Sequence, residues 1–409
     1  MRLFTDSSAG VSVHTSQIIK QKIHNSNKKR NSGFFREGAN TRFTVSQTRD
    51  GFRTFQVRIK HAKVMVNKNF LGTQFPIIQA PMAGVQDSAL AIAVSNAGGL
   101  GSLPCAMLTP EKLRAELTLI KSQTVNPFNV NFFCHHQPQA NIEREQKWLK
   151  ILQPYFDEFC LSSADLSKGS GRIPFNEETA DILAEFKPSI VSFHFGLPSS
   201  SLLSRVREWD ATILASATTI EEANWLEANG ADAIIAQGIE AGGHRGMFLS
   251  YDLSTQLETF ILLKRIVELV KLPVIAAGGI SSAKEVKVAF SHGASAVQLG
   301  TAYLLCPETK TSQIHRAALK SENAQKTVIT NIFSGRPARG IINRLIREIG
   351  PINADTPEFP LAAAAVTSLR KKAEAMGSGD FSPLWCGQNV GGGHEIPAAE
   401  LTKLLAAEL

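Results

Sequence analysis

From Pro76 onward, short apolar runs alternate along the chain with amphipathic stretches of helical length. This alternation is typical of repeated strand–helix units around a parallel sheet. Eight runs are expected to be buried strands: PIIQA (76–80), GLGSL (99–103), FNVNFF (128–133), IVSFHF (190–195), TILAS (212–216), AIIAQ (233–237), PVIAA (273–277) and SAVQL (295–299). They span about 225 residues, close to the roughly 250 of a typical (β/α)8 barrel. We therefore predict an α/β fold, a TIM barrel. A doubly wound open sheet is the alternative, because strand order along the chain does not show closure.

The stretches between these runs predict helices with readable ends. Asp87 can cap SALAIAVSNAG, and Thr219 precedes IEEANWLEANG, which ends on Gly230. The segment 137–187 is long for one crossover, and EREQKWLKILQPYF predicts an extra helix within it. The sequence therefore places a helical insertion between the third and fourth strands.

We divide the chain into three parts. Residues 1–64 form a leader, 65–305 form the barrel, and 306–409 form a mostly helical C-terminal region packed on the barrel. Two segments of the last part look exposed, SGRPARGIINR (334–344) and DFSPLWCGQ (380–388).

The excess positive charge lies at the start of the chain. Residues 1–63 hold 13 Lys and Arg against three acids, whereas the remainder holds 30 against 33, so the leader accounts for the formal net charge of +7. A basic, acid-poor segment is typical of disorder, and it also fits a transit-like leader or a true start at Met65. The remainder has no basic stripe with interleaved aromatic residues, so we expect no nucleic-acid binding.

Composition excludes several further classes. With 43% apolar and 19% charged residues, the chain is typical of globular proteins. It contains no run of eighteen apolar residues, so we expect no membrane insertion. Five scattered cysteines without a CxxC pair fit neither a disulfide framework nor a zinc site, which favours a cytoplasmic location. No HExxH or similar spacing is present, so we expect no catalytic metal. The oligomeric state is left open.

Glycines follow the last two predicted strands, where barrels of this kind commonly hold a phosphate. Gly278 and Gly279 end the seventh, and Gly300 and Thr301 end the eighth. Glycines let backbone N–H groups approach anionic oxygens, and a helix that begins just after them adds its positive end. Because the chain has neither a Walker motif nor GxGxxG after a strand, this pattern favours flavin mononucleotide (FMN) or a phosphorylated substrate.

Other strand ends suit a flat flavin ring. The first strand ends in QAPMAGV, which offers Gln79, Ala80, Pro81 and the soft apolar platform of Met82. Asn131 and Gln237 add amide groups suited to the ring edge.

Two histidines follow strands directly, His194 in SFHFG and His244 in EAGGHRG. Histidine is the natural general base near neutral pH. Gly242 and Gly243 allow the backbone before His244 to pass close to a cofactor. We therefore predict His244 and His194 as the catalytic residues, while Arg245 fits a solvated loop position equally well.

Taken together, these motifs resemble a known family. QAPMAGV, VSNAGGLGSL, PFNVNFFCH, VSFHFG, AQGIEAGGHRG, PVIAAGGI and AVQLGTAYLLCPE look like the histidine-dependent class of nitronate monooxygenase, formerly called 2-nitropropane dioxygenase. The resemblance is dense from Phe75 to Glu308 and looser through SGRPARG and PAAEL. It implies a flavin-dependent barrel that oxidises alkyl nitronates, such as propionate 3-nitronate, with O2 to a carbonyl compound and nitrite.

The resemblance also assigns roles. His244 falls on the family's catalytic histidine and His194 on a second active-site histidine. The family's flavin-binding positions fall on Asn131, Gln237, Gly242, Gly279 and the run Gln298, Leu299, Gly300 and Thr301. The alternatives are an FMN-dependent enoyl-acyl-carrier-protein reductase and an NAD(P)H:quinone reductase on a similar barrel.

Overall fold

The computed structural model describes residues 41–47, 53–59, 70–162, 166, 172–391 and 393–409, and the chain divides into two compact units, Met1–Met65 and Val66–Leu409. In the first unit, strands β1 (Thr41–Gln47) and β2 (Arg53–Ile59) pair antiparallel. The rest of the predicted leader lies outside the described residues, so its disorder stays a prediction.

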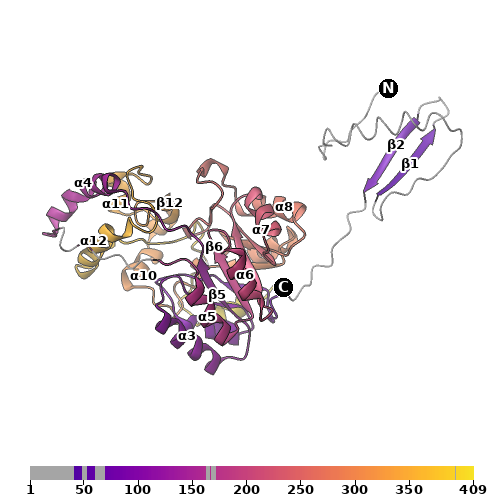
Figure 1. Ribbon diagram of the computed structural model, residues 1–409, viewed down its shortest axis with the longest axis horizontal. Helices are drawn as coiled ribbons and strands as arrows, with labels where there is room; N and C mark the ends of the chain where they lie inside the picture. Colours follow the sequence, from indigo (N-terminus) through magenta and orange to yellow (C-terminus); the bar gives the residue numbers. More distant parts are fainter. Residues whose placement is uncertain (1–40, 48–52, 60–69, 163–165, 167–171, 392) are drawn as a thin grey trace. The chain divides into compact units, whose positions relative to one another are not determined.

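Eight parallel strands form the centre of the second unit (Figure 1). The strands are β3 (Ile77–Gln79), β4 (Gly101–Pro104), β5 (Phe128–Phe133), β6 (Ile190–His194), β7 (Thr212–Ala217), β8 (Ala233–Gln237), β10 (Val274–Ala277) and β11 (Ala296–Leu299). Their order in the sheet is β3-β11-β10-β8-β7-β6-β5-β4. The amide of Gln79 then donates to the carbonyl of Leu100 (2.9 Å), just before β4. The sheet closes on itself, which confirms the predicted barrel and not the open sheet.

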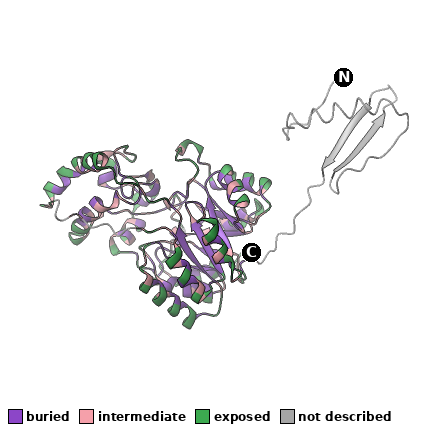
Figure 2. Ribbon diagram, in the orientation of Figure 1, coloured by how far each residue is buried: buried purple, intermediate pink, exposed green. Residues whose placement is uncertain are grey.

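Helices cover the outside of the barrel, with their exposed faces outward (Figure 2). They are α2 (Ser88–Asn96), α3 (Pro110–Gln123), α5 (Glu177–Phe186), α6 (Ser200–Arg207), α7 (Ile220–Ala228), α8 (Thr259–Leu269) and α9 (Ala283–Ser291). The predicted caps are present: Asp87 accepts from the amide of Ala89, and Thr219 accepts from the amide of Glu222. None of the described helices is long and apolar enough to cross a membrane.

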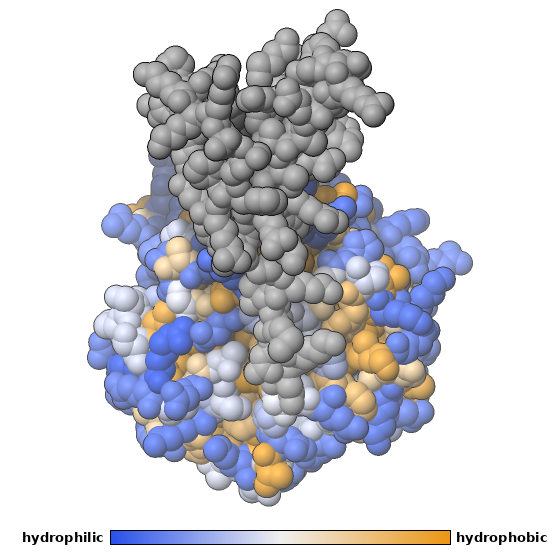
Figure 3. Space-filling view, turned by 90° about the vertical axis from the view of Figure 1, so that its right-hand side faces the viewer, coloured by the Kyte–Doolittle hydropathy of each residue, from blue (hydrophilic) through white to orange (hydrophobic). Residues whose placement is uncertain are grey.

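The barrel strands separate two layers of core. Ile78 packs inside with Leu100 and Ile275, whereas its neighbour Ile77 packs outward in the same cluster as Leu90 of α2. This alternation arises because successive side chains of a strand face opposite ways. On the face shown in Figure 3, hydrophilic side chains predominate and hydrophobic ones gather in small groups.

A separate hydrophobic core lies beside the barrel, in what we call the lobe, residues 142–158 and 327–386. Its elements are α4 (Ile142–Glu158), β12 (Thr327–Thr330), β13 (Ala338–Ile341), α11 (Arg344–Ile349) and α12 (Ala363–Ala375), which lie together at one side of the unit in Figure 1. Trp148 of α4 packs there in one cluster with Leu369 of α12 and Phe381. The insertion after β5 and the C-terminal region therefore fold together.

The remaining C-terminal elements connect the lobe to the barrel. They are α10 (Gln313–Lys320), η4 (Glu322–Gln325) and α13 (Ala398–Leu405), while η2 (Leu253–Thr255) and η3 (Thr301–Tyr303) lie in loops of the barrel itself. The last helix returns to the barrel, where Leu401 joins its outer core and Thr402 hydrogen-bonds the hydroxyl of Tyr303 (2.9 Å).

A small three-stranded sheet links the lobe to the loop after β8. In it, β13 pairs antiparallel with β9 (Gly243–His244), and Ala338 lies opposite His244. A two-residue strand gains little stability alone. The lobe thus holds the histidine loop in place from outside the barrel.

Candidate active site

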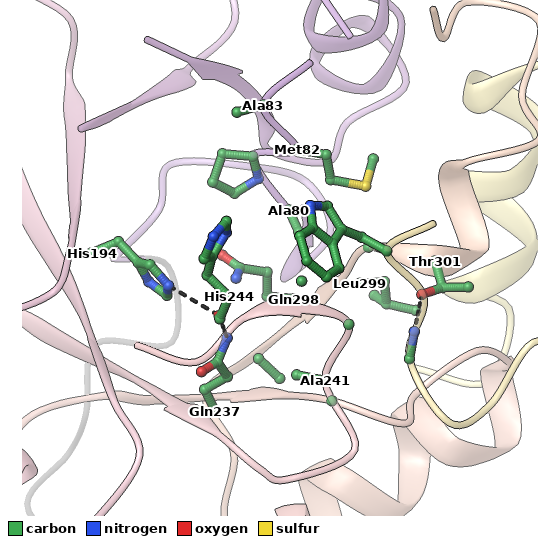
Figure 4. A pocket seen from close by; sticks show the side chains of 18 of the residues that line it. Ala80, Met82, Ala83, His194, Gln237, Ala241, His244, Gln298, Leu299 and Thr301 are labelled. Atoms are coloured by element: carbon green, nitrogen blue, oxygen red, sulfur yellow. Dashed lines mark hydrogen bonds between the residues drawn. The ribbon is translucent and has the colours of Figure 1, made fainter. Parts of the chain in front are cut away.

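A cavity lies at the carboxyl ends of the barrel strands (Figure 4). All but one of the predicted site residues line it: Ala80, Pro81, Met82, Asn131, His194, Gln237, Gly242, Gly243, His244, Gly278, Gly279, Gln298, Leu299, Gly300 and Thr301. The chain therefore brings together residues at or just after the carboxyl ends of β3, β5, β6, β8, β10 and β11, as expected at this end of a barrel.

The exception is Gln79, whose side chain is fully buried behind the cavity. Its Nε2 donates to Gln86 Oε1 (2.8 Å), and its Oε1 accepts from the amide of Ser102 (2.9 Å). Gln86 Oε1 also accepts from the amide of Met82 (2.9 Å). The Gln79 side chain supports the turn that carries Pro81 and Met82.

One end of the cavity is built from glycine backbone. Gly278 and Gly279 have φ angles of +119° and +67°, which side chains other than glycine rarely adopt. A Cβ on Gly278 would lie 2.7 Å from Thr259 Oγ1. The amides of Gly279 and Gly300 have no acceptor among the described residues. Unpaired backbone N–H groups that converge on a cavity suit a phosphate.

The three predicted amide side chains of the cavity differ in which of their polar atoms lack a hydrogen-bond partner. Asn131 Nδ2 donates to Ser192 Oγ (2.9 Å), and Gln237 uses both ends, donating to the His244 carbonyl and accepting from the amide of Gly246 (2.8 Å). Gln298 Oε1 is buried without a partner. A buried acceptor without a donor is costly unless a ligand supplies one. Gln298 is therefore the side chain best prepared to accept from an N–H of a bound ring.

The backbone of His244 is fixed from three sides. Besides the pairing of β9 with β13, its carbonyl oxygen accepts from Gln237 Nε2 (3.0 Å) and lies 3.2 Å from His194 Nε2 (Figure 4). A carbonyl oxygen can only accept, so His194 Nε2 carries the proton. The position of the loop does not depend on the His244 side chain.

The His244 ring is held by the lobe. Its Nε2 lies 2.9 Å from Ser334 Oγ, and the rings of Phe359 and Trp385 each lie 5.4 Å from the imidazole, centroid to centroid. Burial lowers the pKa of His244 well below its usual value, and the nearby charge of Arg172 lowers it further. The resting imidazole is therefore neutral at pH 7 and can accept a proton.

His194 is neutral as well, but both of its ring nitrogens are engaged. Burial lowers its pKa to about 4, against the opposing effect of its hydrogen bond to the His244 carbonyl. With the proton on Nε2, its Nδ1 accepts from the hydroxyl of Ser216 (3.0 Å). The geometry suits a residue that holds the His244 loop.

The cavity is positively charged. Its lining, as far as the structure describes it, contains no Asp or Glu, and Arg172 is its one permanently charged side chain. The guanidinium lies 5.3 Å from the centre of the Phe359 ring. Burial lowers the pKa of Arg172, which shows that its charge is poorly solvated. Such a site favours an anionic ligand. Among the described residues, no group of three or more His, Cys, Asp or Glu could hold a metal.

The expectation that SGRPARGIINR and DFSPLWCGQ are exposed is wrong. Ser334 and Arg336 are buried, as are Phe381 and Cys386. Arg336 lies 3.9 Å from the centre of the Phe195 ring and donates to the carbonyl of Met247 (2.7 Å), so partners from other segments make its burial favourable.

Arg245 lies neither in solvent nor in the cavity. It is fully buried, and its guanidinium donates to the carbonyls of Gln237 (2.7 Å) and Gly238 (2.6 Å) and to Gln256 Oε1. It stabilises the loop after β8, so the solvated position considered from the sequence is wrong.

The residues present fit a flavin. The glycine end offers unpaired amides for a phosphate, Gln298 offers an unpaired acceptor for the ring edge, and Met82 and Pro81 line the space between. A (β/α)8 barrel with these features and a histidine at its mouth defines a flavin-dependent oxidoreductase.

Comparisons with known proteins agree on the family. The nitronate monooxygenase family model matches residues 65–408. The chain is 43% identical over 342 residues to a nitronate monooxygenase of Pseudomonas aeruginosa, covering 83% of this chain and 97% of that protein. It is 41% identical over 341 residues to that of Paraburkholderia phytofirmans, covering 83% and 93%.

Two solved structures are also similar. Nitroalkane oxidase from Streptomyces ansochromogenes matches with a TM-score of 0.76 at 36% identity, covering 83% of this chain and 97% of that chain. FabK from Thermotoga maritima matches with a TM-score of 0.63 at 25% identity, covering 83% and 94%. The chain belongs to the nitronate monooxygenase family, which confirms the resemblance seen in the sequence and makes it an oxidoreductase that oxidises nitronates.

Proposed function

We propose that the chain binds FMN in this cavity and uses O2 to convert alkyl nitronates, with propionate 3-nitronate as the candidate substrate, to a carbonyl compound and nitrite. The observation that supports this most directly is the charge of the cavity. A nitronate is an anion, and the described lining holds the positive charge of Arg172 but no carboxylate. An anionic substrate gains from such a site.

Each end of the cavity has its own task in this proposal. The amides of Gly279 and Gly300 hold the FMN phosphate, and Gln298 accepts from the ring edge. Bound FMN supplies electron transfer between the nitronate and oxygen. Arg172 attracts the anion. His244 binds the anion when it is protonated, and when it is neutral it removes the proton from the carbon that bears the nitro group of a nitroalkane. Trp385 helps to exclude water from this space.

The test of the cofactor is direct. The purified protein should be yellow, and denaturation should release one FMN per chain, as identified by chromatography. Release of FAD, or a colourless protein that does not rebind FMN, would contradict the assignment.

Oxygen consumption tests the reaction. With propionate 3-nitronate, and separately with alkyl nitronates, the enzyme should consume O2 and form nitrite. Anaerobic mixing with NADPH separates the alternatives: prompt loss of flavin colour would favour the enoyl-acyl-carrier-protein or quinone reductase, whereas the proposed function predicts no change.

All five cysteines are unpaired, which supports the cytoplasm as the compartment.

A further inference from the structure

Ser334 reaches His244 from a distant part of the chain. The two residues are 90 positions apart, and the hydroxyl lies 2.9 Å from Nε2 of the imidazole. The other ring nitrogen, Nδ1, makes no hydrogen bond with a described residue, although the ring lines the cavity. Ser334 therefore contacts one ring nitrogen, Nε2, and the other, Nδ1, has no hydrogen-bond partner among the described residues.

The surroundings of the hydroxyl favour one tautomer of the ring. Ser334 is buried, and its Oγ lies 3.4 Å from both the amide nitrogen and the carbonyl oxygen of Arg336. A serine hydroxyl accepts two hydrogen bonds and donates one. If His244 Nε2 carries the proton, Oγ accepts from Nε2–H and from the Arg336 amide and donates to the Arg336 carbonyl. In the other tautomer the hydroxyl donates to Nε2, and the carbonyl loses this donor, which costs free energy when buried.

We infer that Ser334 is a positioning residue that holds His244 as the Nε2–H tautomer, so that the lone pair of Nδ1 is the proton acceptor for substrate. This inference rests on the proposed function, because it concerns removal of the proton from a neutral nitroalkane. When Nδ1 takes that proton, the hydrogen bond from Nε2–H to Ser334 is unchanged. The catalytic step then needs no rearrangement behind the ring.

A hydroxyl orients the ring without adding charge. A carboxylate in this place, as in a Ser-His-Asp triad, would stabilise the imidazolium and raise the pKa of the histidine. Ser334 carries no charge, so the pKa of His244 stays lowered by burial and by the nearby charge of Arg172. His244 thus stays neutral, and able to accept a proton, at pH values where a more basic histidine would already be protonated.

The tautomer can be measured in the full-length flavin-loaded protein without any turnover. With 15N-labelled histidine, long-range 1H–15N correlation spectra distinguish the two neutral forms, and the signals of His244 are those lost in His244→Asn. We expect the Nε2–H form in the wild type, its loss in Ser334→Ala, and its retention in Ser334→Thr, which keeps a hydroxyl. Ser216→Ala, the matched control, should change the signals of His194 and leave the His244 tautomer as it is.

Either of two results would overturn the inference: the Nδ1–H form in the wild type, or an unchanged tautomer in Ser334→Ala. The wild-type spectrum is decisive even if the alanine variant does not fold. It is also independent of the proposed function, since a protein that oxidises no nitronate still shows its resting tautomer.

Kinetics provides the second measurement. Ser334→Ala should lower kcat/KM for neutral nitroethane on the order of tenfold, as for the loss of one hydrogen bond by a buried polar group. The preformed ethyl nitronate, which needs no deprotonation, should keep most of its rate. Equal losses with both substrates would show that Ser334 does not act through proton removal.

Discussion

The two ends of the cavity differ in whether backbone or side chains provide the polar groups. At the glycine end, the backbone of Gly279 and Gly300, which follow the barrel strands β10 and β11, lines the cavity with amides that have no acceptor among the described residues. At the histidine end, the polar groups are side chains, and the lobe holds His244 through Ser334 and the strand β13. In the proposed function, the barrel supplies the cofactor site, whereas the lobe completes the site of proton transfer.

This difference shows how one barrel can serve several reactions. A backbone cradle depends only on where the strands end, so it tolerates changes in most side chains. The histidine end depends on contacts between segments 90 residues apart. Changes at the first end should affect cofactor binding, and changes at the second should affect the reaction itself.

The largest effect is expected for His244→Asn. The variant keeps a polar side chain but cannot take up a proton, and loss of a general base typically costs about 10²- to 10⁴-fold. The loop should stay in place, because Gln237 and His194 hold its carbonyl. Initial rates should fall by this factor with a neutral nitroalkane and much less with the preformed nitronate. Similar losses with both would place His244 on the anion instead of the proton.

Gly279→Val tests the other end. Its φ of +67° would be strained with a side chain, and a Cβ would lie 3.2 Å from Glu240 Cβ, so we expect a cost of about 1–3 kcal/mol in FMN affinity. Flavin retained after dialysis measures the effect. The matched control is Gly377→Val, with a similar φ of +80° but open space around it. This control should retain its flavin; if Gly279→Val does so too, the phosphate assignment is wrong.

Arg172→Gln tests the charge of the histidine end. Removing the permanent positive charge should raise KM for a nitronate roughly tenfold and leave kcat nearly unchanged, because the charge acts on binding. Steady-state oxygen consumption at several ionic strengths measures this. Arg114→Gln removes an exposed charge paired with Glu185 and should change neither parameter. A fall in kcat without a change in KM would contradict a role in attraction.

The smallest effect is expected from His135, which packs 4.8 Å from the Phe359 ring with both ring nitrogens unpaired. Burial lowers its pKa to about 4, below the roughly 6.5 of an unfolded chain. Between these values the unfolded state binds more protons, so stability falls as the pH falls. His135→Phe should raise Tm roughly 1–3 °C more at pH 5 than at pH 7.5. An equal shift at both would exclude this cause.

The barrel and its glycine end could be predicted because their signals are local. Each apolar run marks a strand, and whatever follows a strand lies at the cavity, so Gly279 and His244 were found from their neighbours in the chain. Gln79 shows the limit of this rule. It ends β3, but its side chain is buried away from the cavity, where Gln86 and the amide of Ser102 satisfy it.

The lobe could not be predicted in the same way. Ser334 and Trp385 follow no barrel strand, and the arginines around Ser334 made the segment look exposed. Arg336 is buried because Phe195 and the carbonyl of Met247, both far away in the sequence, receive its guanidinium. Long-range partners of this kind leave no periodic or local pattern in a single sequence.

The double acceptance at the His244 carbonyl has a consequence for protein engineering. Two donors on barrel strands, Gln237 and His194, fix the position of the carbonyl oxygen of residue 244. This contact does not depend on which side chain residue 244 carries. We therefore expect that another acid, base or nucleophile can be introduced at position 244 without a shift of the backbone. Libraries that vary this position together with Ser334 would sample other catalytic side chains on the same backbone.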